Sequence, residues 1–412
     1  MKRNIQRRDV LKGAGAAGLA GLAGCLGGNG NGNGGSAETI QYGILMPETG
    51  DLGDLGVTIR DGARLVSRQL EGEVDFEFDT ATRDTQTDPQ TGLSEAEDLI
   101  NEGYPAVVGP AASNVNLQVT ESVFIPNEVV GISPSSTAPA VTDLDDNDFI
   151  FRTCPSDALQ GQVMANVALD NRGASTSATL YLNDDYGQAL EEEYVAAFED
   201  GGGEVTAQVS FEPEQSSYSS QLGEALGDDP DVLMVVGFPQ SGIQLFRDYY
   251  SEYDTGAEIL VPDGLRSSSL PDEVDNPMNN VYGTSPSSQG PGADAFASAY
   301  EEEWGNPPEV FNGQAYDAAA VITLARVAAG ENSGTGIRDS LRDVANPDGD
   351  NYGPGDLADA VSAVADGDAI DYQGASSSVD FDDNGDMRAV FYEIFKYEEG
   401  DIEALDTIEF EA

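Results

Sequence analysis

Short hydrophobic runs alternate along this chain with longer segments in which apolar residues recur every three or four positions. The short runs are typical of buried strands, and the helical spacing is clear at Ile59, Ala63, Val66 and Leu70. Alternating strands and helices favour parallel sheets that are covered by helices on both faces. The pattern breaks near residues 152–157, so we predict an α/β fold of two lobes.

The individual elements follow from the same pattern. We predict strands at residues 39–46, 76–78, 106–108, 129–132, 178–182, 205–211, 232–236 and 258–261. We predict helices at residues 56–69, 89–101, 114–124, 159–170, 187–199 and 241–252. A chain of 412 residues is longer than one hydrophobic core usually supports, which agrees with two lobes.

The first 37 residues have a different character. Arg7-Arg8 fits a twin-arginine export pattern, and the apolar run 14–24 is too short to span a bilayer. The run ends in LAGC, which resembles a lipoprotein cleavage box with Cys25 as the lipidated residue. We therefore predict a signal at 1–24 and a flexible Gly/Asn linker at 25–37, anchored outside the cytoplasm; an uncleaved membrane anchor is the alternative.

The chain is strongly acidic, with 75 Asp and Glu against 18 Lys and Arg and a net charge of −57. Molar salt shortens the Debye length to about 3 Å and screens the resulting repulsion, so the composition indicates a halophilic archaeal source. A nucleic-acid partner is excluded, because no basic patch is present to neutralise phosphates. The acids are spread along the whole chain, which argues against a calcium store.

The sequence has no histidine and two cysteines. Without histidine, Ser-His and Cys-His pairs and the commonest zinc ligands are missing, so we predict neither an enzyme nor a metal or cofactor site. A carboxylate-pair hydrolase is the remaining enzymatic alternative. With Cys25 assigned to lipid, Cys154 has no disulfide partner and is expected to be buried.

Hydroxyl residues gather in the loops that follow two predicted strands. Ser113 lies in GPAASNV, and Ser135, Ser136 and Thr137 lie in SPSSTAP. Ligands of open α/β sheets bind beyond the carboxyl ends of strands, and hydroxyls at helix starts suit a carboxylate. Helix capping alone is the structural alternative for Ser113 and Thr137.

These segments, taken in order, resemble the branched-chain amino-acid-binding (Leu/Ile/Val) family of ABC importers, which has the type I periplasmic binding fold. The resemblance runs from about Ile40 to Tyr397. Its motifs are GILMPETGDLGDLGVTIRDGARL, D-x-x-x-D-P at 84–89, VGPAASNV, ISPSSTAP, FRTCPSDALQG, NDDYGQAL, QAYDAAAV and VDFDDNGD. The fold it implies is two Rossmann-like lobes joined by a three-crossing hinge, with an N-terminal lobe at 38–156 plus 286–389 and a C-terminal lobe at 157–285 plus 390–412.

The resemblance also implies a binding site between the lobes. Ser113 and Thr137 would hold the ligand carboxylate, with Ser135 contributing backbone contact. The ligand ammonium would be held by Asp157 and by Asp263, where Glu is usual. Tyr186 would close over the ligand.

Two departures from the family pattern bear on the ligand. Leu55 stands where an aromatic residue often lines the side-chain pocket, and Phe238 replaces a polar aromatic segment. Small amides such as urea therefore remain an alternative to a branched-chain amino acid.

The implied function is capture of a small zwitterion by a lipid-anchored receptor that delivers it to ABC permease subunits. A ligand-binding sensory module is the alternative from another class.

The segment Asp380–Gly385, here called the calcium-like run, matches the beginning of a calcium-binding EF-hand loop. Phe391 occupies the twelfth position of that loop, where Glu is required. We predict a hairpin turn there instead.

Overall fold

Two sheets of different size form the frame of this computed structural model, which describes residues 38–253, 255–346 and 349–411. The predicted export signal, the linker and Cys25 lie outside the described residues. Within those ranges, no helix has the length and hydrophobicity needed to cross a membrane.

The first sheet has five parallel strands in the order β2-β1-β3-β4-β5. Its central strands are buried, whereas β2 lies at the edge and is half-exposed. Its strands are β1 (Glu38–Met46), β2 (Phe76–Asp84), β3 (Ala106–Val108), β4 (Val130–Ser133) and β5 (Ile150–Arg152).

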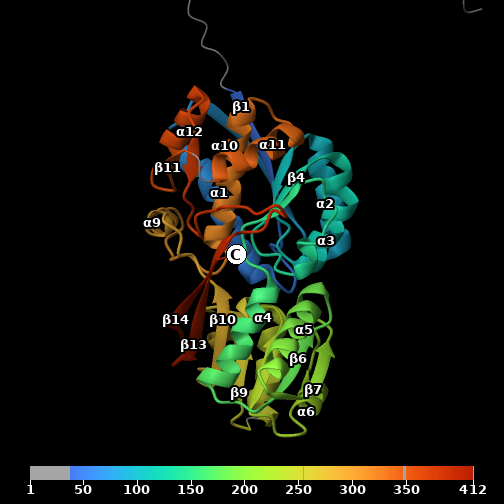
Figure 1. Cartoon of the computed structure of the whole chain (residues 1–412). Coiled ribbons are helices and arrows are strands. Elements are labelled where there is room, and N and C mark those ends of the chain that lie inside the picture. Colours follow the sequence, from blue (N-terminus) through green and yellow to red (C-terminus); the bar gives the residue numbers. More distant parts are fainter. Residues whose placement is uncertain (1–37, 254, 347–348, 412) are drawn as a thin grey trace, which may run out of the picture. The chain divides into compact units, whose positions relative to one another are not determined.

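Helices cover both faces of this sheet (Figure 1), with α1, α10 and α11 on one side and α2 and α3 on the other. Helix α10 is buried along almost its whole length, which explains its alanine-rich sequence. The helices of this lobe are α1 (Gly53–Leu70), α2 (Pro89–Glu102), α3 (Ser113–Val119), α9 (Ala293–Trp304), α10 (Asn312–Ala329), α11 (Gly334–Ala345) and α12 (Leu357–Asp366).

The second sheet has seven strands in the order β14-β13-β10-β9-β8-β6-β7. Its strands are β6 (Thr176–Leu182), β7 (Glu204–Phe211), β8 (Val232–Val236), β9 (Glu258–Val261), β10 (Val281–Pro286), β13 (Ala389–Glu398) and β14 (Asp401–Glu411). Its helices are α4 (Asp157–Asn166), α5 (Asp185–Asp200), α6 (Ser219–Ala225), α7 (Pro239–Asp248) and α8 (Leu270–Val274).

The chain passes between the two sheets three times: after β5, after β10 and before β13. The predicted α/β fold with two lobes is therefore confirmed. Strands β13 and β14 pair antiparallel, so the second sheet is mixed rather than purely parallel. A small parallel pair, β11 (Asp350–Tyr352) and β12 (Ile370–Tyr372), has no counterpart among the predicted elements.

Differences in element length have physical causes. Strand β2 continues to Asp84, six residues beyond its predicted end at Phe78, because an edge strand accommodates the polar residues that follow. The predicted helices 114–124, 159–170 and 241–252 are each an α-helix that ends in a wider π-helical turn, at Thr120–Phe124, Val167–Asn171 and Tyr249–Tyr253.

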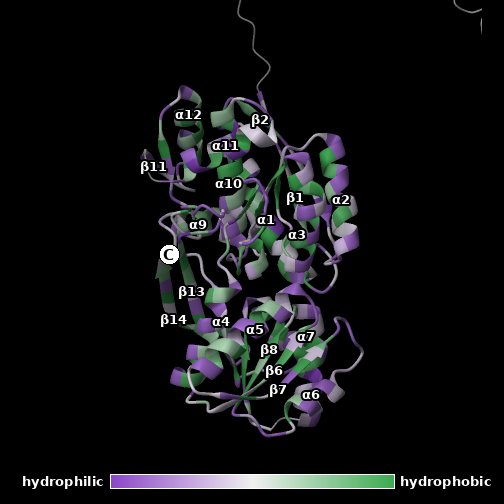
Figure 2. Cartoon of the chain, turned by 45° about the vertical axis from the view of Figure 1, so that its right-hand side comes forward, coloured by the Kyte–Doolittle hydropathy of each residue, from purple (hydrophilic) through white to green (hydrophobic). Residues whose placement is uncertain are grey.

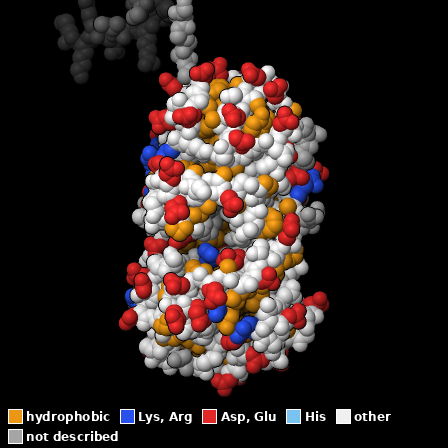
Figure 3. Space-filling model, turned by 90° about the vertical axis from the view of Figure 1, so that its left-hand side faces the viewer, with side chains coloured by type: hydrophobic (Ala, Val, Ile, Leu, Met, Phe, Trp, Pro, Cys, Tyr) orange, Lys and Arg blue, Asp and Glu red, His pale blue; other side chains and the backbone are white. Residues whose placement is uncertain are grey.

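Apolar residues concentrate on the central strands, while the outer helix faces are polar (Figure 2). On the face shown in Figure 3, acidic side chains are distributed widely instead of gathering at one place. Among the described residues, every basic side chain except Arg247 forms an ion pair with a carboxylate. The excess acidic side chains repel one another in dilute buffer, and salt screens this repulsion.

Candidate functional site

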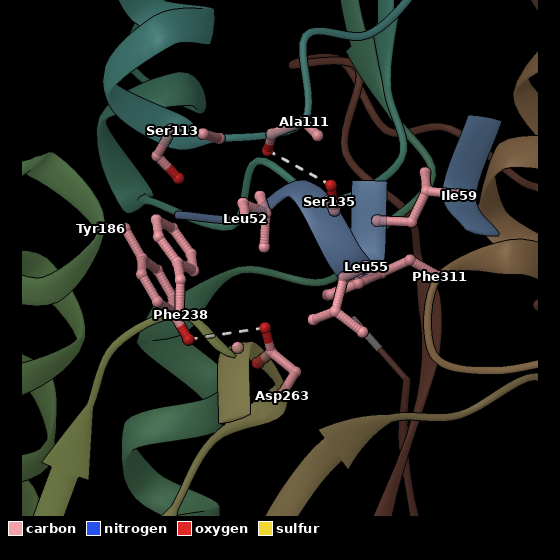
Figure 4. A pocket seen from close by; sticks show the side chains of 12 residues that line it. Leu52, Leu55, Ile59, Ala111, Ser113, Ser135, Tyr186, Phe238, Asp263 and Phe311 are labelled. Carbon is pink, nitrogen blue, oxygen red and sulfur yellow. Dashed lines mark hydrogen bonds between the residues drawn. The ribbon is translucent and has the colours of Figure 1, made fainter. Parts of the chain in front are cut away.

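A pocket lies between the lobes, beyond the carboxyl ends of strands from both sheets (Figure 4). The space between its walls is about 300 Å³ when the part open to solvent is included, and most of its wall is apolar. The lining residues are Leu52, Leu55, Ile59, Ala111, Ala112, Ser113, Ser135, Tyr186, Phe238, Asp263, Gly264 and Phe311. Most of them follow the end of a parallel strand, which is where α/β sheets bind ligands.

Serine hydroxyls shape the first-lobe side of the pocket. The Ser133 hydroxyl donates to the Pro110 carbonyl at 2.6 Å and accepts from the Ser136 N–H at 2.9 Å, which fixes the loop after β4. Ser135 donates its hydroxyl proton to the Ala111 carbonyl at 3.2 Å. The Ser113 hydroxyl accepts from the Ala138 N–H at 3.3 Å, so its own proton is free to be donated to a ligand.

Arg152 supports the same loop from behind. The side chain is fully buried and donates to the carbonyls of Ser136, Thr137 and Ala138. Its charge is balanced by Asp386, which accepts from the Nη2 atom at 3.0 Å. Asp386 directly follows the calcium-like run, which forms a tight turn closed by an antiparallel bridge between Phe381 and Met387.

Two aromatic rings form the second-lobe wall. Tyr186 and Phe238 stack with their centroids 5.3 Å apart and an interplanar angle of 5°. The Tyr186 hydroxyl lies 3.5 Å from Oδ2 of Asp263, a long contact that leaves this carboxylate oxygen weakly satisfied. Gly264 has no room for a side chain, because a Cβ atom there would lie 2.5 Å from the Gly237 carbonyl.

The carboxylates of Asp157 and Asp263 are both buried and no basic residue lines the pocket. Burial raises the pKa of Asp263 to about 6, against hydrogen bonds that lower it. Burial also raises the pKa of Asp157 well above its usual value, and the charge of Asp263 raises it further. One oxygen of Asp157, Oδ1, has no hydrogen-bond partner. Such a pair favours a ligand that brings a positive charge.

Gln160 lies beside these two carboxylates and was not predicted as a site residue from the sequence. Its amide nitrogen donates to Oδ1 of Asp263 at 2.7 Å and to the Thr284 carbonyl at 3.2 Å. Its amide oxygen is buried without a donor. Gln160 lies one helical turn after Asp157 on α4, so the D-x-x-Q spacing was a readable signal.

The structure brings six of the eight predicted site residues to the pocket wall: Ser113, Ser135, Tyr186, Asp263, Phe238 and Leu55. Thr137 and Asp157 do not line this pocket and contact each other instead. The Thr137 hydroxyl donates to Oδ2 of Asp157 at 3.0 Å, and the Asp157 N–H donates to the Thr137 carbonyl at 2.8 Å. The hydroxyl proton of Thr137 is therefore engaged by Asp157, where the chain crosses between the lobes.

Leu52, Ile59 and Phe311 were also missed. Phe311 gave no local signal, because it reaches the pocket from the start of α10, far along the chain. Its φ of 66° is unusual for a bulky residue and holds the ring at the pocket wall. Cys154 is buried and free, as predicted. Among the described residues, no group of acidic or cysteine side chains could hold a metal ion.

The chain is similar to several known proteins. Residues 39–366 match the periplasmic binding protein family. The chemotactic signal transduction system substrate-binding protein BasB of Halobacterium salinarum is 28% identical over 84% of this chain and 84% of its own length. Its source supports the halophilic origin that the acidity indicates.

Two further similarities concern amino-acid-binding proteins. A leucine-, isoleucine-, valine-, threonine- and alanine-binding protein of Pseudomonas aeruginosa is 24% identical over 74% of this chain and 83% of its own. The crystal structure of a leucine-binding protein from Thermotoga maritima superposes with a TM-score of 0.77 at 23% identity, covering 90% of this chain and 98% of that one. These are binding proteins, which confirms the expectation that the chain is not an enzyme.

Proposed function

Because this chain belongs to the periplasmic binding protein family, we propose that it captures a branched-chain or related amino acid between its lobes and delivers it to the membrane subunits of an ABC importer. Capture would take place outside the cytoplasm, where proteins of this family work. The ligand would close the lobes by binding the closed state more tightly than the open one.

The buried carboxylate of Asp263, at the edge of an apolar pocket without a basic residue, carries this proposal. A ligand ammonium would pair with Asp263 in the pocket wall, and Asp157, whose charge interacts with that of Asp263, would add to the attraction from outside the wall. The ligand carboxylate would be held by neutral donors such as the Ser113 hydroxyl. Leu52, Leu55 and Ile59 would contact an aliphatic side chain, which a urea-sized amide would leave uncovered.

Calorimetry in molar KCl tests the proposal with leucine, isoleucine, valine, threonine and alanine, and with urea, acetamide and benzoate as other ligand classes. We expect an aliphatic amino acid to bind most tightly, and Asp263→Asn or Asp157→Asn to weaken it at least tenfold. Asp143→Asn, a change of equal charge at an exposed position, is the matched control. Absence of binding across the panel, with no effect of Asp157→Asn, would refute the assignment.

A second candidate function is sensing, because the relative from Halobacterium salinarum is named for chemotactic signal transduction. In that case the liganded protein would bind a membrane transducer in place of a permease. Affinity capture from membranes of the native organism, with isoleucine present, distinguishes the two partners.

We further propose attachment to the membrane through a lipid on Cys25 after export by the twin-arginine route. The acidic chain would fold in salt before export. Export of a variant with Arg7→Lys and Arg8→Lys would contradict this route. An N-terminal peptide whose mass differs between wild type and Cys25→Ser only by the exchange of sulfur for oxygen would contradict lipidation.

A further inference from the structure

Helix α7 begins directly beside the pocket and lacks a cap of its own. Its N-cap residue is Phe238, whose side chain makes no capping hydrogen bond, and its first residue is Pro239. The next two backbone N–H groups, of Gln240 and Ser241, have no acceptor within the helix because they lie in its first turn. Something outside the helix must satisfy them.

Asp51 of the first lobe supplies both acceptors. Its carboxylate oxygen Oδ1 accepts from the Ser241 N–H at 2.7 Å, and its backbone carbonyl accepts from the Gln240 N–H at 3.3 Å. The Gln240 side chain adds a third link across the lobes by donating to Asp54 at 2.8 Å. Asp51 is only 4% exposed. A carboxylate that bonds the third N–H of a helix is an N-cap, here contributed by the opposite lobe.

We propose that Asp51 is a positioning residue for ligand capture: it caps α7 from across the cleft and thereby holds the lobes closed without touching the ligand. The inference rests on the proposed function, in which the lobes open and close. Opening would break all three links and return Asp51 and the start of α7 to water. Phe238 lies both in the pocket wall and at the capped helix start, so ligand contact and capping favour the same closed arrangement.

Salt would strengthen this latch. The cleft beside it, about 820 Å³ when the part open to solvent is included, is lined by Asp51 and Asp88 from the first lobe and by Asp184, Glu212 and Glu214 from the second. No basic residue lines it, so closure brings like charges together. Oδ2 of Asp51 is buried without a partner. Concentrated cations would screen this repulsion while leaving the buried 2.7 Å hydrogen bond between Ser241 and Asp51 intact.

Amide hydrogen exchange at Gln240 and Ser241 tests the latch, in molar KCl with and without isoleucine. We expect both amides to exchange at least tenfold faster in Asp51→Ala than in the wild type, and isoleucine to dissociate faster. Asp51→Asn keeps an acceptor oxygen, so its exchange rates should lie between those of the wild type and those of Asp51→Ala. The control is Asp143→Ala, which removes an exposed acid of the same lobe.

The outcomes separate this inference from the proposed function. Equal exchange at both amides in the wild type and Asp51→Ala, with and without isoleucine, would overturn the latch. If the two amides exchange faster in Asp51→Ala but the wild type binds no amino acid, the latch is supported and the proposed ligand is refuted. Unchanged exchange elsewhere in α7 shows that the variant is folded.

Discussion

The buried guanidinium of Arg152 forms an ion pair with the partly exposed carboxylate of Asp386, 234 positions away in the sequence. Arg152 also bonds three consecutive carbonyls of the loop after β4, so the pair connects the last crossover of the chain to a wall of the pocket. The carboxylate that directly follows the calcium-like run is thus already paired with a cation from the protein itself.

Replacing Asp386 should destabilise the protein. Asp386→Ala leaves the Arg152 guanidinium buried and unpaired, and we expect the free energy of unfolding to fall by about 3–5 kcal/mol. Denaturant unfolding in molar KCl measures the change. Asp383→Ala, an exposed acid in the same turn, should change stability by less than about 0.5 kcal/mol. Equal losses in the two variants would contradict the role of the pair.

Ligand binding should release a proton. The pKa of Asp263 is about 6 in the ligand-free pocket, because burial penalises its charged form. A bound ammonium stabilises the carboxylate and lowers that pKa, so affinity is full above about pH 6 and is lost as the pH falls. Below pH 6, we expect the affinity for isoleucine to fall by up to tenfold per pH unit for each proton that binding must release. Calorimetry in buffers of different ionisation enthalpy counts the protons, and Asp263→Asn should remove this dependence.

Gln160→Met tests the amide that supports Asp263. The variant keeps the volume but removes the 2.7 Å hydrogen bond that stabilises the charged carboxylate, so the pKa of Asp263 should rise. We expect affinity at neutral pH to fall about tenfold and the pH midpoint of binding to move upward. Gln162→Met, exposed on the same helix, is the control. A purely structural role would lower stability without moving the midpoint.

Tyr186 should act through its ring more than its hydroxyl. The ring stacks on Phe238, whereas the contact of the hydroxyl with Asp263 is long, at 3.5 Å. We expect Tyr186→Phe to change the affinity for isoleucine by less than threefold, and Tyr186→Ala to lower it more than tenfold. Stopped-flow fluorescence or calorimetry measures both variants. A large loss in Tyr186→Phe would show that the hydroxyl binds the ligand directly.

Local pattern accounts for most of the first two-thirds of the fold. Strands such as β8 and β9 were predicted with their observed bounds, because short buried apolar runs read clearly in sequence. Strands β13 and β14 were not predicted. They pair antiparallel at the edge of the second sheet, and half of their residues are polar because one side faces solvent.

The sequence alone determined that the chain is an acidic α/β protein with two lobes and hydroxyl and carboxylate residues after its strands. These properties are local, since they follow from periodicity, charge and residue type. The tertiary structure decided which side chains share a cavity. It turned the Thr137 hydroxyl toward Asp157, brought Phe311 to the pocket and placed Asp51 on a helix of the other lobe. Those contacts depend on how the lobes pack, and a linear pattern carries no record of that packing.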